Sequence, residues 1–416
     1  MRLYGEILNP PKLRFDFSST YAEDTYSKRG LKRYGPYDSN LFLHDRIKCV
    51  VMFPSEYEKE KQILVEGLIK GEGSFEGFER FFKIHLDFVE EVSFNSQNVM
   101  FLVNKILADI NPDIVYVILP KDNSNLYKKI KLRLLLNGIP SQVITPEKLA
   151  DSVGRQYTLE NIALASYAKV GGTPWTISTP TDENNLVIGV SRAQDYSNRY
   201  LVGFVTLFTN DGDFLFMHSK APVIEWDQYV NGLSELIISA IDEYKNIHGS
   251  PDSIVVHFHK RPGKKEIKAI ENALRVADED IRYAIIHLNE YSNFRLFDTS
   301  HNTYIPPRGL KVNLSSHEVL LLVDGRIGDK RPGVGVPRVL NVRMDKRSTI
   351  SMDKFPNLVK QIYDFSYINW RAFNAKAIPV TLNYSKLIAR MIIELGVQNW
   401  NEIIAEGRLR DKSWFL

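Results

Sequence analysis

The 416-residue chain has one cysteine, Cys49, and so neither a disulfide framework nor a cysteine-based zinc site. No apolar run reaches the roughly 18 residues that a membrane-spanning helix needs. The N-terminal stretch MRLYGEILNPP lacks the apolar core of a secretion signal. The formal net charge of +3 does not by itself call for a nucleic-acid partner. We therefore expect a globular protein of the reducing cytoplasm, long enough for two or three domains.

The first 175 residues divide into an irregular segment and an alternating one. Residues 1–40 mix proline, glycine and aromatic residues without a clear period. Strands and helices then alternate, and the pattern predicts strands at IKCVVMF, DIVYVILP and PSQVI and helices at 55–70, within 76–90, at 125–138 and at 159–172. Such alternation is typical of a parallel α/β sheet, so we expect a first domain over 41–175.

The pattern changes in residues 176–416, which we expect to form a second domain. Successive strands are predicted at 186–193, 200–209, 212–218, 253–260, IRYAIIHLN and EVLLLVDG, and helices at 225–247, 263–278, 355–370 and 384–396. The turn TNDG makes the second and third strands a hairpin. Three antiparallel strands, a helix and then a parallel strand is the opening order of an RNase H-like fold.

The stretch NLYKKIKLRLLLNGIPSQVI, residues 125–144, places Tyr127 and Lys131 one helical turn apart. The helix starts at the carboxyl edge of the predicted sheet, where ligands bind in open α/β folds. Its free N–H groups favour an anion. One interpretation is a pocket for a terminal phosphate. The other is a surface Tyr–Lys pair on an exposed helix, which spacing alone favours.

Several longer motifs resemble one family. NLYKKIKLRLLLNGIPSQ and YTLENIALASYAKVGGTPW resemble the MID domain of Argonaute proteins. YAIIHLNE, LKVNLSSHEVLLLV, INWRAFNAKAIPVTLNYSKLIA and SWFL resemble their PIWI domain, and LKRYGPYD their N-terminal segment. The resemblance covers about residues 30–416 and is strongest to the short prokaryotic and archaeal forms that consist of MID and PIWI. It implies a Rossmann-like MID domain followed by an RNase H-like PIWI domain.

The resemblance also implies how a guide strand is held. In the family, Tyr, Lys, Gln and Lys bind the 5′ phosphate of the guide, and these match Tyr127, Lys131, Gln142 and Lys169. The terminal carboxylate, here that of Leu416, holds a divalent cation against the phosphate. Mg²⁺ or Mn²⁺ is expected there, with Gln142 offering a carbonyl oxygen.

The positions that carry catalytic acids in active Argonautes differ here. Ser191 replaces the first Asp, the turn FHKRPG has Lys260 and Arg261 in place of the third acid, and Lys386 stands at the last position. Because cations repel Mg²⁺, we expect an inactive PIWI domain; the Glu of the tetrad is not placed. An alternative is an active nuclease whose acids lie elsewhere, with four available aspartates: Asp182, Asp195, Asp324 and Asp329.

A basic cluster follows the strand at 253–260. It comprises Lys260, Arg261, Lys264 and Lys265. One interpretation is that these residues hold the phosphate backbone of a paired strand, and the other is a solvated run of charge.

The resulting expectation is a cytoplasmic protein that uses a guide RNA to recognise a DNA target in prokaryotic defence. The resemblance, together with an inactive PIWI domain, also implies a separate effector subunit with a TIR, Sir2-like, nuclease or membrane-acting module. A third possibility, an interaction protein that has lost guide binding, is opposed by the intact set of four guide-binding residues.

Overall fold

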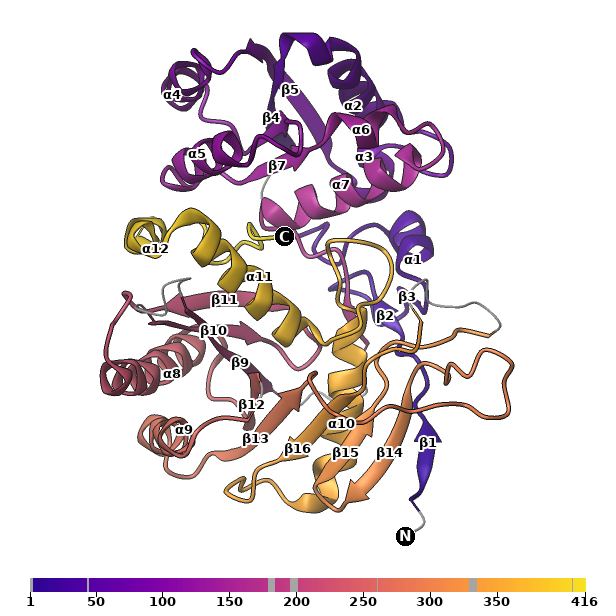
Figure 1. Ribbon diagram of the computed structural model, residues 1–416, viewed down its shortest axis with the longest axis vertical. Coiled ribbons are helices and arrows are strands. Elements are labelled where there is room, and N and C mark those ends of the chain that lie inside the picture. Colours follow the sequence, from indigo (N-terminus) through magenta and orange to yellow (C-terminus); the bar gives the residue numbers. More distant parts are fainter. Residues whose placement is uncertain are drawn as a thin grey trace. The chain divides into compact units, whose positions relative to one another are not determined.

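The computed structural model describes residues 3–42, 45–178, 184–194, 201–259, 261–328, 335–405 and 407–416 (Figure 1). The chain forms two compact units, each built from separate segments. The small-sheet unit comprises Leu13–Thr176, Trp370–Phe373 and Glu394–Leu416. The large-sheet unit comprises Met1–Lys12, Ile177–Asn369 and Asn374–Ile393. The main change of unit lies beside the expected boundary at 175, but residues 394–416 belong to the small-sheet unit.

The small-sheet unit is built on four parallel strands in the order β5-β4-β6-β7. The strands are β4 Arg46–Pro54, β5 His85–Phe94, β6 Ile114–Ile118 and β7 Ser141–Ile144. The helices around them are α2 Glu58–Lys70, α3 Phe78–Phe82, α4 Val99–Asp109, α5 Ser124–Leu135, α6 Pro146–Ala150 and α7 Arg155–Lys169. Helix α12 Trp400–Ala405 also belongs to this unit. Helices lie on both sides of the sheet (Figure 1), so every residue of β6 is buried. A sheet covered on both faces explains why its strands read as continuous apolar runs.

Several elements of this unit were not predicted from the sequence. Strand β5 forms an edge of the sheet and is largely exposed, so HLDFVEEVSF carries charges where a core strand would be apolar. The segment expected to be irregular contains short strands β2 Leu13–Arg14 and β3 Glu23–Asp24 and helix α1 Ser27–Tyr34. The helix includes Gly30, because the ring of Phe15 lies 2.1 Å from where a β-carbon would stand.

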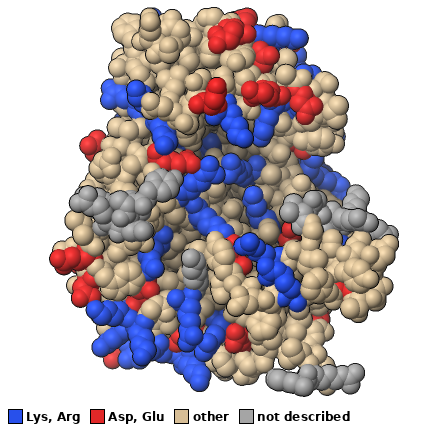
Figure 2. All heavy atoms as spheres, in the orientation of Figure 1, with Lys and Arg blue, Asp and Glu red and all other residues tan. Residues whose placement is uncertain are grey.

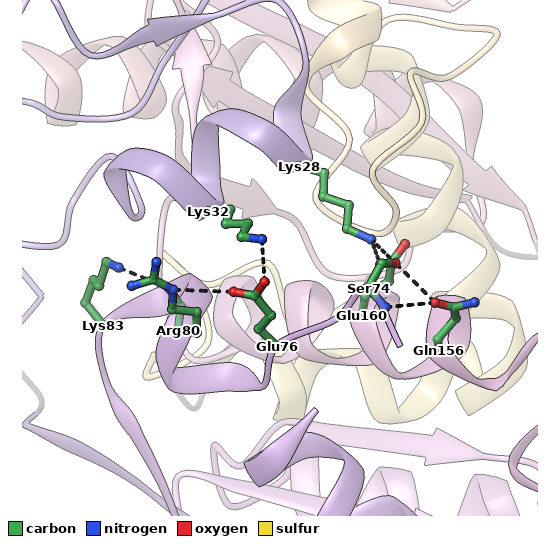
Figure 3. Close-up of polar contacts among 8 residues, drawn as sticks. All are labelled: Lys28, Lys32, Ser74, Glu76, Arg80, Lys83, Gln156 and Glu160. Atoms are coloured by element: carbon green, nitrogen blue, oxygen red, sulfur yellow. Dashed lines mark hydrogen bonds and ion pairs between the residues drawn. The ribbon is translucent and has the colours of Figure 1, made fainter. Parts of the chain in front are cut away.

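Charged contacts fix α1 to the rest of the small-sheet unit (Figure 3). The ammonium group of Lys28 pairs with the buried carboxylate of Glu160 and donates to the Ser74 hydroxyl at 2.9 Å. One turn later, Lys32 pairs with Glu76. Residues before the predicted MID domain are therefore an integral part of its fold.

The large-sheet unit contains nine strands in the order β1-β14-β15-β16-β13-β12-β9-β10-β11. The strands are β1 Gly5–Ile7, β9 Asn185–Gln194, β10 Leu201–Phe208, β11 Phe214–Ser219, β12 Ser253–His259, β13 Arg282–Asn289, β14 Leu310–Ser315, β15 Glu318–Leu321 and β16 Leu340–Met344. Strands β9, β10 and β11 are antiparallel, and β12 and β13 continue parallel to β9. The predicted strand order is therefore confirmed. β8 Thr176–Ile177 pairs outside this sheet.

Helices cover both faces of the large sheet. Helices α8 Trp226–His248 and α9 Lys264–Ala277 pack against each other and against Val256 and Phe258 of β12. Because side chains alternate along a strand, His257 faces the other way. Its Nδ1 lies 3.0 Å from the hydroxyl of Thr381 on α11 Val380–Leu395. Helix α10 Phe355–Asp364 precedes α11 in the chain.

Candidate functional sites

The four residues predicted to hold a phosphate all lie in the small-sheet unit and form two close pairs. On α5, the ammonium group of Lys131 is 5.8 Å from the centroid of the Tyr127 ring. At the end of α7, Lys169 donates to the backbone oxygen of Ser141 at 2.9 Å and to Oε1 of Gln142 at 2.7 Å. Both lysines are almost fully buried, with 4% and 2% of their surface exposed. We call this group the lysine pocket.

The electrostatics of the lysine pocket favour an incoming anion. Burial lowers the pKa of Lys131 from its ordinary 10.5 to about 8; Glu394 opposes this shift and Arg371 adds to it. Burial also lowers the pKa of Lys169 well below its ordinary value, with further contributions from Lys131 and Arg371. A buried ammonium group is costly without a compensating charge. Several cations thus gather in a poorly solvated place, where a phosphate would relieve their repulsion.

Arg371 and Glu394 were not predicted as part of this pocket. Both come from the short segments that the small-sheet unit takes from far along the chain. No local spacing links them to Tyr127 and Lys131. Arg371 does lie in the quoted motif INWRAF, which was the available clue.

The end of the chain packs into the small-sheet unit, as its aromatic residues predicted. Trp414, Phe415 and Leu416 are buried, and the Trp414 ring centroid is 6.2 Å from that of Trp400. A divalent cation was expected to take Oε1 of Gln142 as a ligand. This oxygen already accepts a hydrogen bond from Lys169. The cationic surroundings of Gln142 do not by themselves suit a divalent metal. A divalent cation would fit there only together with an anion.

A second group of polar residues lies in the large-sheet unit, at the carboxyl ends of the parallel strands. The register that pairs Phe258 with Val190 places Ser191 of β9 level with His259 of β12. Glu290 follows β13 directly, and its Oε1 lies 3.2 Å from Nε2 of His259. We call this group, with Lys386, the strand-end cluster.

Lys386 of α11 completes the strand-end cluster by pairing with Oε2 of Glu290. Although burial raises the pKa of Glu290, the hydrogen bonds from His259 and Lys386 lower it to about 2. The negative charge of Glu290 is thus compensated within the protein by Lys386. The sequence pattern predicts Lys386 at this site but does not reveal Glu290, which ends the motif YAIIHLNE.

The structure places one of the four aspartates proposed for an active nuclease. Asp324 follows β15, which is four strand positions from β9 in the sheet. At about 4.8 Å per strand, that is roughly 19 Å from the strand that carries Ser191, whereas β13, which Glu290 follows, is two positions or roughly 10 Å away. The others lie outside the described residues: Asp182, Asp195 and Asp329. Within the described ranges, no three His, Cys, Asp or Glu side chains are grouped to hold a metal ion.

The predicted basic cluster is partly neutralised. Arg261, Lys264 and Lys265 are exposed, and Lys and Arg gather over the face formed by α9 (Figure 2). Lys265, however, pairs with Asp227 at 2.6 Å. Lys260 lies outside the described residues. The exposed charge near the start of α9 therefore rests mainly on Arg261 and Lys264.

The two sites stand on an α/β fold of the Argonaute PIWI type. The family model for the Piwi domain matches residues 114–395, so the chain belongs to this family. Among curated proteins, it is 27% identical to the Piwi protein of Archaeoglobus fulgidus, over 93% of both chains. It is also 27% identical to the argonaute protein of Cereibacter sphaeroides, over 98% of this chain. The chain spans 58% of that protein's length.

Solved structures confirm the predicted fold class. Clostridium butyricum Argonaute bound to a guide DNA and a 19-mer target DNA superposes with a TM-score of 0.75 over 95% of this chain, at 18% identity. Drosophila Piwi superposes with a TM-score of 0.74 over 99% of this chain, at 17% identity. The chain covers 54% and 56% of those proteins, respectively. Within the part of the chain that is described, no helix has the length and apolarity to cross a membrane.

Proposed function

We propose that this protein binds a nucleic-acid guide by its 5′ phosphate and uses base pairing to recognise a complementary strand. The observation that supports this proposal is the lysine pocket, where Lys131 and Lys169 are buried beside Arg371. Charge-assisted bonds to phosphate are the strong class of hydrogen bond. Burying cations in this way makes sense when an anion completes the site.

The finer features follow from the resemblance to short prokaryotic Argonautes. The guide is RNA, the target is DNA, and the protein acts in cytoplasmic defence with an effector subunit that carries a TIR, Sir2-like, nuclease or membrane-acting module. A Mg²⁺ or Mn²⁺ ion joins the guide phosphate, held by the carboxylate of Leu416 and the remaining lone pair of Gln142 Oε1.

We further propose that the large-sheet unit does not cleave the target. Two-metal nucleases need carboxylates that face two cations. In the strand-end cluster, Glu290 instead forms an ion pair with Lys386, and position 191 is a serine. Because Lys386 is paired with this carboxylate, Glu290 is not available as a metal ligand. The exposed cations at Arg261 and Lys264, with Lys260 and Lys265, then bind the backbone of the paired strand.

The test compares guides with a 5′ phosphate and a 5′ hydroxyl in equilibrium binding, with and without EDTA. Lys131→Glu with Lys169→Glu should weaken binding of the phosphorylated guide by a hundredfold or more, since each bond to a charged group contributes about 1.5–3 kcal/mol. The hydroxyl guide should be little affected. EDTA should weaken only the phosphorylated guide.

The matched control is Lys129→Glu, which makes the same charge change at an exposed position on α5. It should leave the discrimination between the two guides intact. Equal losses for both guides in the double variant would place the phosphate site elsewhere.

A further inference from the structure

The connection between β13 and β14 carries exposed aromatic side chains that the proposed function has not used. It spans residues 290–309 and reads EYSNFRLFDTSHNTYIPPRG. Phe294, Phe297 and Tyr304 have 51%, 59% and 57% of their surface exposed. Rings of this size are usually buried, because each hides a large apolar area from water.

This connection is held in shape by a network centred on Asp298. Its carboxylate pairs with Arg326 at 2.8 Å, and its backbone N–H donates to the carbonyl oxygen of Tyr304 at 3.0 Å. The Nε of Arg326 donates to the carbonyl oxygen of Ile305 at 3.0 Å. Phe297 precedes Asp298 in the chain, so Phe297 and Tyr304 flank the closed end of one fixed turn.

The exposed rings stand beside residues that anchor the turn to the core. Leu296 packs against a buried apolar cluster that includes Leu320 and Leu322, and Ile305 is 5% exposed. Their neighbours in the chain, Phe297 after Leu296 and Tyr304 before Ile305, are exposed to solvent. The anchors thus supply the packing that holds the turn, and the exposed rings are not needed for it.

The backbone at Tyr304 provides an independent indication. Its φ of +57° lies in the left-handed region, which bulky residues rarely adopt. Glycine or asparagine would occupy this position with less strain. Such outliers persist where the surroundings impose them and concentrate at functional positions. A tyrosine kept here in spite of the backbone suggests that its ring has a use.

A positive charge accompanies the rings. Arg295 lies between Phe294 and Phe297, is exposed, and donates to the carbonyl oxygens of Ser292 and Phe294. These contacts orient the guanidinium group and leave its charge in place. Aromatic rings interleaved with arginine are suited to stacking on bases while attracting the backbone.

We propose that Phe294, Phe297 and Tyr304 form a stacking platform for the unpaired bases of a nucleic-acid strand. The inference rests on the proposed function, because it requires that a guide and target are bound. Every base has a flat face, so the platform would accept any sequence. It would favour targets that continue as a single strand beyond the paired region.

The experiment loads the full chain with a phosphorylated guide and compares two DNA targets. One target ends flush with the guide, and the other adds six unpaired nucleotides at each end, including 2-aminopurine as a fluorescent reporter of stacking. The extended target should bind about tenfold more tightly than the flush one. Its 2-aminopurine fluorescence should be quenched on binding.

The test variant is Phe297→Ala with Tyr304→Asn, because asparagine tolerates the left-handed backbone and keeps the turn folded. It should abolish both the tenfold gain and the quenching while the flush target binds as before. The matched control is Phe101→Ala, which removes a ring of 69% exposure on α4 and should change neither.

The outcomes separate the two proposals. If no guide is loaded, the proposed function fails. If guide and flush target bind but the extension adds neither affinity nor quenching, the platform is wrong. Loss of self-association or of a partner protein in the variant, with extended-target binding unchanged, would instead make this surface a protein interface and also overturn the inference.

Discussion

The positive charges of Lys131 in the lysine pocket and Lys386 in the strand-end cluster have opposite surroundings. Lys131 is buried beside other cations, so its pKa falls to about 8. Lys386 pairs with Glu290, whose pKa falls to about 2 because its charged form is bonded. In the first site Glu394 compensates the positive charge only in part, so an external anion would balance it further; the second site cancels its charge internally. Fold stability and ligand binding should therefore oppose each other in one unit and not in the other.

The largest effect is expected from Lys386→Met. The change leaves the half-buried Glu290 with His259 alone, so the free energy of unfolding should fall by about 1–3 kcal/mol. Urea denaturation at pH 7 measures it. Ser191→Asp, alone or added to Lys386→Met, should not restore cleavage of a guided DNA target in Mn²⁺.

Lys386→Gln serves as a second variant, since it can still donate to Glu290 and should recover part of the stability. A guide-dependent cut at one fixed position, in the wild type or in either variant, would contradict the internal cancellation of charge.

Lys131→Met should have the opposite sign. Replacing a buried, incompletely compensated ammonium group with an apolar side chain should raise the free energy of unfolding by about 1–2 kcal/mol. The same change should weaken the phosphorylated guide. Calorimetry without guide and a binding titration measure the two effects. A loss of stability would show that Lys131 is fully compensated in the unbound protein.

The sequence predicted much of the lysine pocket and less of the strand-end cluster. Tyr127 and Lys131 share a helical face, and Gln142 and Lys169 lie in motifs that resemble a known family. The contribution of Arg371 could not be predicted from the sequence, because its proximity to Lys131 depends on tertiary structure. Similarly, β5 was missed because an exposed edge strand carries charges.

The strand-end cluster shows the same limit. Ser191 and Lys386 were recognised as replacements, but pairing of Lys386 with Glu290 depends on how α11 packs on the sheet. Helix α1 was missed because Gly30, which reads as a helix breaker, is required there by the ring of Phe15.

The smallest effect is expected from pH. Because the pKa of Lys131 is lowered in the folded state, the unfolded chain binds more protons between about pH 8 and 10.5. Lys131 should therefore make stability rise with pH in this window. Affinity for the phosphorylated guide should fall in the same window, by up to about tenfold per pH unit, since the bound phosphate favours the protonated lysine.

Titrations at pH 7, 8 and 9 with both guides check the pH dependence. Lys131→Met should flatten it, and a hydroxyl guide should lack it. A phosphate-specific affinity that is unchanged between pH 8 and 9 would show that Lys131 stays protonated in the unbound pocket.

The division of the small-sheet unit among three stretches of chain has a consequence for biosynthesis. Residues up to Thr176 leave the ribosome long before Glu394–Leu416, which complete the same unit. At about 5–20 residues per second, the interval is roughly 10–40 s. During that time the nascent chain displays Lys131 and Lys169 without Arg371 or the buried aromatic tail. The lysine pocket is therefore complete only after these later segments have been translated, so the proposed guide would be captured by molecules that have passed this stage rather than by earlier nascent chains.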